Sequence, residues 1–219
     1  MDFPHPPPAA RVALDRLVAA DHDLAQIEAA AGPLAWRRRP PGFEGLLQAI
    51  VGQQISIQAA GAIWARLRLV PGALVPAGVL ALDDETLRAA GLSRPKVAHA
   101  RALAAAFADG RLDAGALARM PDDAAIAAIS AVRGMGSWSA EIYLLFALER
   151  PDVFPAGDLA LAGAAAALKG LPARPGPVAL RALAQGWAPW RGLAARLLWH
   201  HWRHLMGRPV FDAIDAPIR

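Results

Sequence analysis

The 219-residue sequence contains no cysteine. A chain without thiols forms no disulfide bond and has no cysteine nucleophile. It also lacks the thiolate ligands that hold cysteine-type zinc sites and most iron–sulfur clusters. Those classes of structure and chemistry are therefore excluded.

Aromatic residues are scarce as well. They make up 6% of the chain and include a single tyrosine, whereas hydrophobic residues, mostly alanine and leucine, make up 55%. Strands are rich in β-branched and aromatic residues, while alanine and leucine are strong helix formers. No convincing strand and no internal repeat is found, so we predict an all-α protein.

The chain has no long apolar run and no leader-like start. No segment of roughly 20 apolar residues, the length needed to cross a bilayer, is free of charges, glycine and proline. The N-terminus reads MDFPHPPPAA and lacks the basic-then-apolar order of a signal peptide. We expect a soluble cytoplasmic protein that does not interact with membranes.

The charge imbalance is modest. Twenty-three Lys and Arg stand against nineteen Asp and Glu, giving a net charge of +4. This excess is compatible with nucleic-acid binding. The charge alone is a weak signal, because surface arginine more often serves only solubility.

Helical periodicity begins after a proline-rich segment, residues 1–8, which we expect to be disordered. It runs from Val12 to Gly32 as one apolar pattern, and a basic loop, WRRRPPG, follows. Ser56 is a predicted helix cap, and residues 71–78 are a predicted loop. Further helices are predicted at residues 43–52, 57–69, 83–92, 95–110, 114–119, 122–132 and 137–148, and from Asp158, Pro177 and Trp190 onward.

One turn between two of these helices is unusual. Residues 132–141 read VRGMGSWSAE, and an apolar helix opens at Ser137. Glycines allow a positive φ and a close approach to the main chain, and the amides at the start of a helix favour an anion such as phosphate. An ordinary helix–helix corner with a glycine cap is the alternative interpretation of Gly134 and Gly136.

Three other features weaken that alternative. An acid, Asp158, follows the stretch DVFPAG at a helix start, where the helix end favours negative charge, although such an aspartate is often only a cap. Five of the seven tryptophans lie in the later half, where flat rings suit stacking on bases as well as core packing. The loop VGQQIS places Gln53 and Gln54 between two apolar helices.

Five segments together resemble the helix-hairpin-helix DNA glycosylases, and within them the bacterial 3-methyladenine-DNA glycosylase II (AlkA) type. In order they are FEGLLQAIVGQQIS, GLSRPKVAHARALA, VRGMGSWSAEIYLL, DVFPAGDLAL and WAPWRGLAARLLWHHW. The resemblance covers roughly residues 42–202. It implies hydrolysis of the N-glycosidic bond of a damaged nucleotide that is flipped out of double-stranded DNA.

The resemblance also assigns roles to residues. It implies that Asp158 is the catalytic carboxylate, which stabilises an oxocarbenium-like sugar or orients water, with no cofactor for catalysis. The implied base pocket contains Trp138, Trp199 and Tyr143, because indole faces favour electron-poor alkylated bases. The implied DNA contacts are Gly134, Met135, Gly136, Ser137, Gln53, Gln54 and Ser56. The carbonyls of Ser130, Val132 and Met135 match positions that hold a structural monovalent cation (Na⁺ or K⁺) in the family.

The implied architecture is two helical lobes that flank a cleft for DNA and the base. We expect residues 9–56 and 148–206 to form one lobe and residues 57–147 the other, with the helix-hairpin-helix at 122–148 and a C-terminal tail at 207–219. The additional N-terminal α/β domain of fuller members is expected to be missing, because residues 1–41 are too few for it. Gln54 stands where relatives often carry a leucine wedge.

These features predict a monofunctional enzyme that starts base excision repair at alkylated bases such as 3-methyladenine and 7-methylguanine. Trp138 occupies the position of the Schiff-base lysine of strand-nicking relatives, so we expect no lyase activity. We expect a bacterial monomer that acts at the nucleoid. Two alternatives stay open: a non-catalytic helix-hairpin-helix DNA-binding module, and a glycosylase for another lesion such as hypoxanthine or ethenoadenine.

Overall fold

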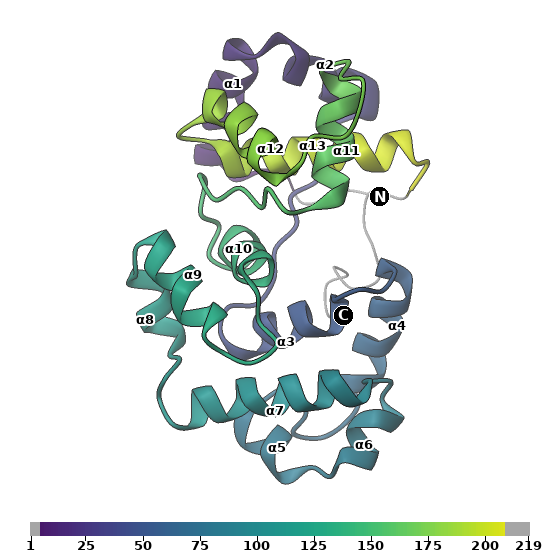
Figure 1. The fold of residues 1–219 in the computed structure, drawn as a ribbon, viewed down its shortest axis with the longest axis vertical. Coiled ribbons are helices and arrows are strands. Elements are labelled where there is room, and N and C mark those ends of the chain that lie inside the picture. The colour runs from purple at the N-terminus through teal and green to yellow at the C-terminus, as the bar shows by residue number, and fades with distance from the viewer. Residues whose placement is uncertain (1–4, 209–219) are drawn as a thin grey trace. The chain divides into compact units, whose positions relative to one another are not determined.

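The structure is a computed structural model that describes residues 5–208 (Figure 1). Predictions for residues 1–4 and 209–219 lie outside the described residues. Within residues 5–208 the chain forms thirteen α-helices and one 3₁₀-helix, and no strand. The all-α prediction is therefore confirmed. None of the helices in this part of the chain is long and apolar enough to cross a membrane.

The described residues divide into two compact units. Residues 5–37 and 150–208 form the terminal unit, and residues 38–149 form the central unit. This division differs from the sequence prediction for residues 38–56 and 148–149, which were expected in the lobe with the chain ends. The reason is helix α3 (Phe43–Gly52), which is buried around most of its circumference and packs on α7 (Arg94–Ala108) and α10 (Ser137–Phe146) of the central unit.

The terminal unit is built around its last helix, α13 (Arg191–Leu205), which packs against helices from both ends of the chain. The remaining elements are α1 (Pro8–Ala20), α2 (His22–Ala31), α11 (Leu159–Leu168), α12 (Pro177–Ala184) and the 3₁₀-helix η1 (Gln185–Trp187). The single helix expected up to Gly32 is in fact two. The chain breaks at Asp21, whose backbone is extended (φ −129°) and whose side chain caps α2.

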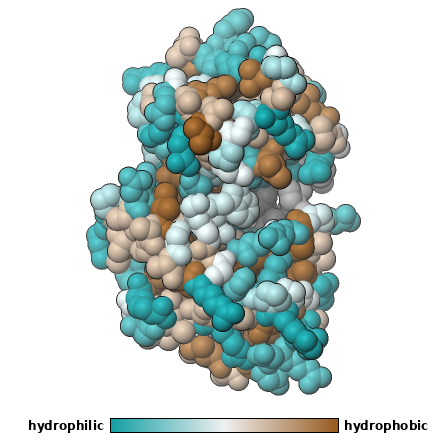
Figure 2. Space-filling view, viewed as in Figure 1, coloured by the Kyte–Doolittle hydropathy of each residue, from teal (hydrophilic) through white to brown (hydrophobic). Residues whose placement is uncertain are grey.

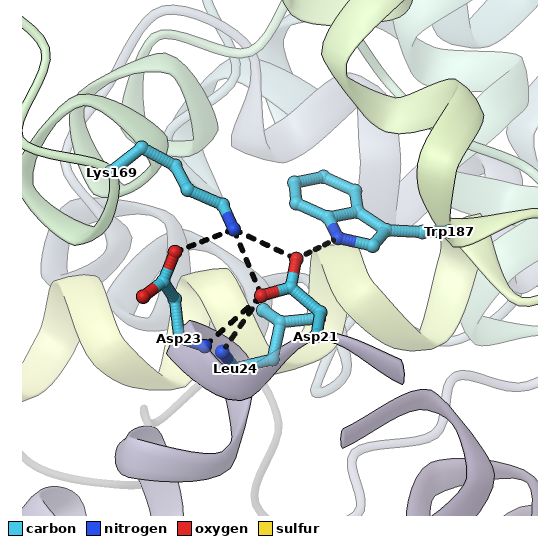
Figure 3. A network of polar contacts seen from close by, with 5 residues as sticks. All are labelled: Asp21, Asp23, Leu24, Lys169 and Trp187. Atoms are coloured by element: carbon cyan, nitrogen blue, oxygen red, sulfur yellow. Dashed lines mark hydrogen bonds and ion pairs between the residues drawn. The ribbon is translucent and has the colours of Figure 1, made fainter. Parts of the chain in front are cut away.

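Asp21 is also the centre of a polar network (Figure 3). Its carboxylate accepts hydrogen bonds from the amides of Asp23 and Leu24, from the indole Nε1 of Trp187 at 2.7 Å, and from Lys169 Nζ at 2.8 Å. Burial raises the pKa of Asp21, but the hydrogen bonds from Lys169 and Trp187 outweigh it, so the pKa is lowered. The network fastens the start of α2 to the end of α11.

The central unit contains the helices from α3 to α10. Besides α3, α7 and α10 these are α4 (Ile57–Leu67), α5 (Pro76–Ala81), α6 (Asp84–Ala89), α8 (Ala114–Arg119) and α9 (Asp122–Ser130). Ser56 caps α4 as predicted. The loop predicted at residues 71–78 instead gives way to α5 at Pro76, because proline is suited to the first turn of a helix. Helix α10 ends at Phe146, two residues earlier than predicted.

Helix α7 positions the other elements of this unit. It packs on α3 and on α5, and α10 packs on both α3 and α9. Its N-cap is Ser93, whose hydroxyl accepts a hydrogen bond from the amide of Lys96. Apolar residues on the face shown in Figure 2 are scattered among polar ones, as expected where most large apolar side chains are buried.

Candidate active site and DNA interface

The hairpin connects α9 to α10, and its two glycines differ in what surrounds them. Gly134 has a φ of +87°, which favours glycine, and a side chain there would collide with the imidazole of His99 on α7. Gly136 has a φ of −96° and is exposed, and a Cβ there would meet nothing within 4 Å. Gly134 therefore serves the fold, whereas Gly136 lies on an open surface of the central unit.

The start of α10 has the features of an anion site. Its N-cap is Gly136, which has no side chain to accept a hydrogen bond from the first-turn amides. Ser137, the first helical residue, is exposed. Unpaired amides and the helix dipole at such a terminus favour a negative group. Met135 contributes only main-chain atoms to this surface, because its side chain is buried at 4% exposure.

The predicted cation site consists of carbonyls at the end of α9 and in the turn that follows it. The carbonyl of Val132 already accepts the amide of Met135 at 3.0 Å. The buried hydroxyl oxygen of Ser130 finds no hydrogen-bond partner among the described residues. A buried oxygen without a partner is unfavourable. The oxygen-only donor set, with this orphaned hydroxyl, is chemically suited to a hard monovalent cation.

The two glutamines at the centre of the loop differ in their contacts. Gln53 Nε2 donates to the carbonyl of Gly134 at 2.8 Å and to Ser139 Oγ at 3.1 Å, so this side chain is bound to the hairpin. Gln54 is exposed and adopts a φ of +56°, which is uncommon for a residue with a side chain. The hydroxyl of Ser56 accepts the amide of Ala59 at 3.1 Å as the cap of α4.

Two aromatic residues of α10 were predicted to line the base pocket. Trp138 is half-buried in the first turn of the helix, so part of its ring is accessible. Tyr143 is buried at 1% exposure, and its hydroxyl accepts a hydrogen bond from the amide of Gly42 at 2.8 Å. Burial raises the pKa of the Tyr143 phenol. The structure thus places Tyr143 in the interior with its hydroxyl engaged, and its role in the base pocket stays a prediction.

Asp158 is the N-cap of α11 and is half-buried. Its Oδ1 accepts the amides of Ala160 and Leu161, each at 2.9 Å, and the indole Nε1 of Trp199 at 3.2 Å. The amide bonds are those of an ordinary cap. The third bond comes from α13 and fixes the orientation of the carboxylate from outside its own helix.

A second tryptophan of α13 sets the spacing between α11 and α13. A Cβ on Gly163, in the middle of α11, would lie 2.6 Å from Cζ3 of Trp202. Arg174 covers the Trp202 ring, with its Cζ 5.6 Å from the ring centroid. Trp202 is one of the five tryptophans in the later half of the chain, and no role was predicted for it. Gly163, a lone glycine within an alanine-rich helix, was the sequence signal that a large side chain packs closely there.

The predicted site residues thus fall into two groups. Asp158 and Trp199 lie in the terminal unit and touch each other. All the other predicted site residues lie in the central unit, where Gln53 and Gly134 are hydrogen-bonded. His99, which packs on the hairpin glycine, was missed, because nothing in its local sequence marks a partner 35 positions away.

A family model described as HhH-GPD superfamily base excision DNA repair protein matches residues 47–189. A DNA-3-methyladenine glycosylase of Schizosaccharomyces pombe is 30% identical over 161 residues, 72% of this chain and 71% of the relative.

Two solved structures have a similar fold. The S. pombe 3-methyladenine DNA glycosylase in complex with abasic DNA gives a TM-score of 0.79 at 27% identity, covering 87% of this chain and 95% of that one. A DNA-3-methyladenine glycosidase of Bacillus halodurans gives 0.76 at 31% identity, covering 93% and 94%.

Proposed function

Because the chain belongs to the HhH-GPD superfamily of base excision DNA repair proteins, we propose that it is a monofunctional DNA glycosylase for alkylated bases of the 3-methyladenine and 7-methylguanine class. Its relatives named as 3-methyladenine glycosylases support the substrate class. The single observation that carries the proposal is the carboxylate of Asp158, held by two amides of α11 and by the indole of Trp199.

Such a carboxylate suits cleavage of a glycosidic bond. A base alkylated at N3 or N7 is positively charged and leaves with the bonding electron pair, so the sugar becomes oxocarbenium-like. A carboxylate whose orientation is already fixed stabilises that charge without reorganising. Water then adds to the anomeric carbon and loses its proton, which Asp158 accepts or passes to solvent. The step needs no metal and no organic cofactor.

The proposed absence of lyase activity has support beyond Trp138. The sequence contains only two lysines, Lys96 and Lys169. Lys96 Nζ donates to the carbonyl of Val51 at 2.7 Å, and Lys169 Nζ is paired with Asp21 and Asp23. Both amines are thus engaged in other contacts, which supports the proposal that neither acts as a nucleophile.

The proposed partner is double-stranded DNA with a damaged base, bound by a monomer. Phosphate would bind at the exposed start of α10, at Gly136 and Ser137, and Gln54 would fill the gap left by the flipped base. We propose that Na⁺ or K⁺ binds at the carbonyls of Ser130, Val132 and Met135. Such an ion would neutralise partial negative charge on the turn, and the orphaned hydroxyl of Ser130 supports its presence.

The proposal is tested by incubating the protein with DNA that carries 3-methyladenine or 7-methylguanine and measuring the free base. Release is expected from the wild type, and Asp158→Asn should lower the single-turnover rate by about a hundredfold or more. Asparagine keeps the cap acceptor, so folding should be retained. Release of neither base by folded, DNA-binding protein would refute the proposal in favour of a non-catalytic module. Parallel assays with hypoxanthine and ethenoadenine test the alternative lesions.

A further inference from the structure

Gln53 joins two segments of the central unit that are far apart in the sequence. Its Nε2 donates one hydrogen bond to the carbonyl of Gly134 in the hairpin turn and one to Ser139 Oγ in the first turn of α10. A glutamine amide nitrogen has two hydrogens, and the two bonds use both. Gln53 therefore has no amide hydrogen left to donate to a DNA phosphate.

The next residue is Gln54, whose exposed side chain leaves a backbone in the left-handed region. A residue with a side chain keeps such a conformation only where its surroundings impose it. Two contacts hold the chain just before it. Lys96 Nζ donates to the carbonyl of Val51 at 2.7 Å, and the side chain of Gln53 is bound to the hairpin.

We propose that Gln53 is a positioning residue that couples phosphate binding at the hairpin to insertion of Gln54 into the duplex. A phosphate that docks on the amides at the start of α10 orders the hairpin, including the carbonyl of Gly134 and the hydroxyl of Ser139. Because Gln53 is bonded to both groups, it becomes fixed with them and holds the backbone of Gln54 in place. The coupling rests on the proposed function, because it assumes that Gln54 enters DNA beside a flipped nucleotide.

The coupling predicts a specific loss when the donor is removed. Gln53→Met keeps the length and apolar stem of the side chain but has no amide hydrogens. Gap filling should fall by about tenfold, which corresponds to ~1.4 kcal/mol and is of the size expected for hydrogen bonds of this kind. Affinity for undamaged DNA should stay within about twofold, because the phosphate site itself is intact.

The experiment uses a duplex in which a tetrahydrofuran abasic analogue lies opposite 2-aminopurine. Filling the gap changes the fluorescence of 2-aminopurine, and no base has to be released, so failure of the proposed glycosylase activity is detected separately. Binding to an undamaged duplex of the same sequence is measured alongside. Gln54→Ala is the reference for loss of the inserted side chain, and Gln58→Met, at an exposed position of α4, is the matched control.

We expect Gln53→Met and Gln54→Ala to lose the fluorescence change to the same extent, and the double variant to be no worse than either. Ser139→Ala, which removes only the longer of the two bonds, should give a smaller loss. The coupling would be overturned if Gln53→Met gave the wild-type fluorescence change, or if the losses in the double variant were additive. It would also be overturned if Gln53→Met lost affinity for undamaged DNA to the same extent. A thermal melt of every variant separates these outcomes from unfolding, and Ser139→Ala keeps the test available if Gln53→Met does not fold.

Discussion

The imidazole of His99 occupies the space that a side chain on Gly134 would need. Helix α7 thus restricts the hairpin at Gly134, and the φ of +87° places a second restriction on the same residue. The two glycines of the hairpin can therefore be tested against each other, because only one of them is restricted in this way.

Gly134→Ala should destabilise the protein by about 1–3 kcal/mol, from the left-handed backbone and the collision with His99 together. Gly136→Ala should change the free energy of unfolding by less than about 0.5 kcal/mol, as exposed substitutions usually do. It should nevertheless weaken DNA binding, since the added methyl group lies on the proposed phosphate surface. Denaturant unfolding and titration with undamaged duplex measure the two effects.

The matching double variant, Gly134→Ala with His99→Ala, should recover part of the lost stability, because it removes the collision but not the backbone strain. Full recovery would show that alanine at position 134 carries no backbone strain. No recovery would show that the His99 contact is unimportant.

Trp199→Phe removes the indole donor to Asp158 and keeps an aromatic ring. The single-turnover rate of base release should fall by about tenfold, since one hydrogen bond to a charged group is lost. The melting temperature should change little. Trp190→Phe is the control, because Trp190 is the N-cap residue of the same helix, whereas the indole bonded to Asp158 is that of Trp199. Gly163→Ala should give a similar loss of rate by pushing Trp202, and with it α13, away from α11.

Much of the helical pattern follows from the sequence, and the exceptions have a physical cause. Leu14, Leu17, Leu24 and Ile27 keep one helical phase on both sides of Asp21, so periodicity alone predicts a single helix. The break depends on Lys169 and Trp187, which are distant in sequence and satisfy the Asp21 carboxylate. Local patterns cannot report such a tertiary partner.

In the candidate site, too, local features could be predicted and contacts between distant residues could not. Family motifs located Asp158 and the hairpin, because those residues carry local signals of a cap and a glycine turn. The burial of Tyr143 could not be predicted, because helical spacing does not distinguish a pocket wall from a core. The bond between Trp199 and Asp158 spans 41 positions and became visible only in the folded chain.

The ion pair of Asp21 should make stability depend on pH in the acid range. The pKa of Asp21 is lowered in the folded protein, so its contribution is fully present above its ordinary value of 3.8 and is lost as the pH falls below it. Asp21→Asn keeps the cap acceptor but loses the charge. The difference in free energy of unfolding between wild type and variant should therefore be largest near neutral pH and shrink below the ordinary pKa. A difference that stays constant into the acid range would contradict the assignment.

The lysine count makes a clear prediction about borohydride trapping. A lyase forms a Schiff base with the sugar, and borohydride reduces it to a stable covalent adduct. Incubation with abasic DNA and borohydride should give no adduct, because Lys96 and Lys169 are both held in other contacts. Burial lowers the pKa of Lys96, which makes it the residue to check if an adduct forms. Loss of that adduct in Lys96→Met would reassign the protein as bifunctional.

Gln54→Gly should separate stability from function. Glycine adopts a positive φ without penalty, whereas a residue with a side chain pays roughly 1–2 kcal/mol there. Part of this gain is offset by the greater freedom of glycine in the unfolded chain, so the melting temperature should rise slightly or stay unchanged. Base release from a duplex should fall, because no side chain remains to fill the gap. Release from single-stranded alkylated DNA, which has no opposite base to hold apart, should be affected much less. A clear drop in melting temperature would mean that the Gln54 side chain supports the fold, and an unchanged rate on duplex DNA would mean that another residue fills the gap.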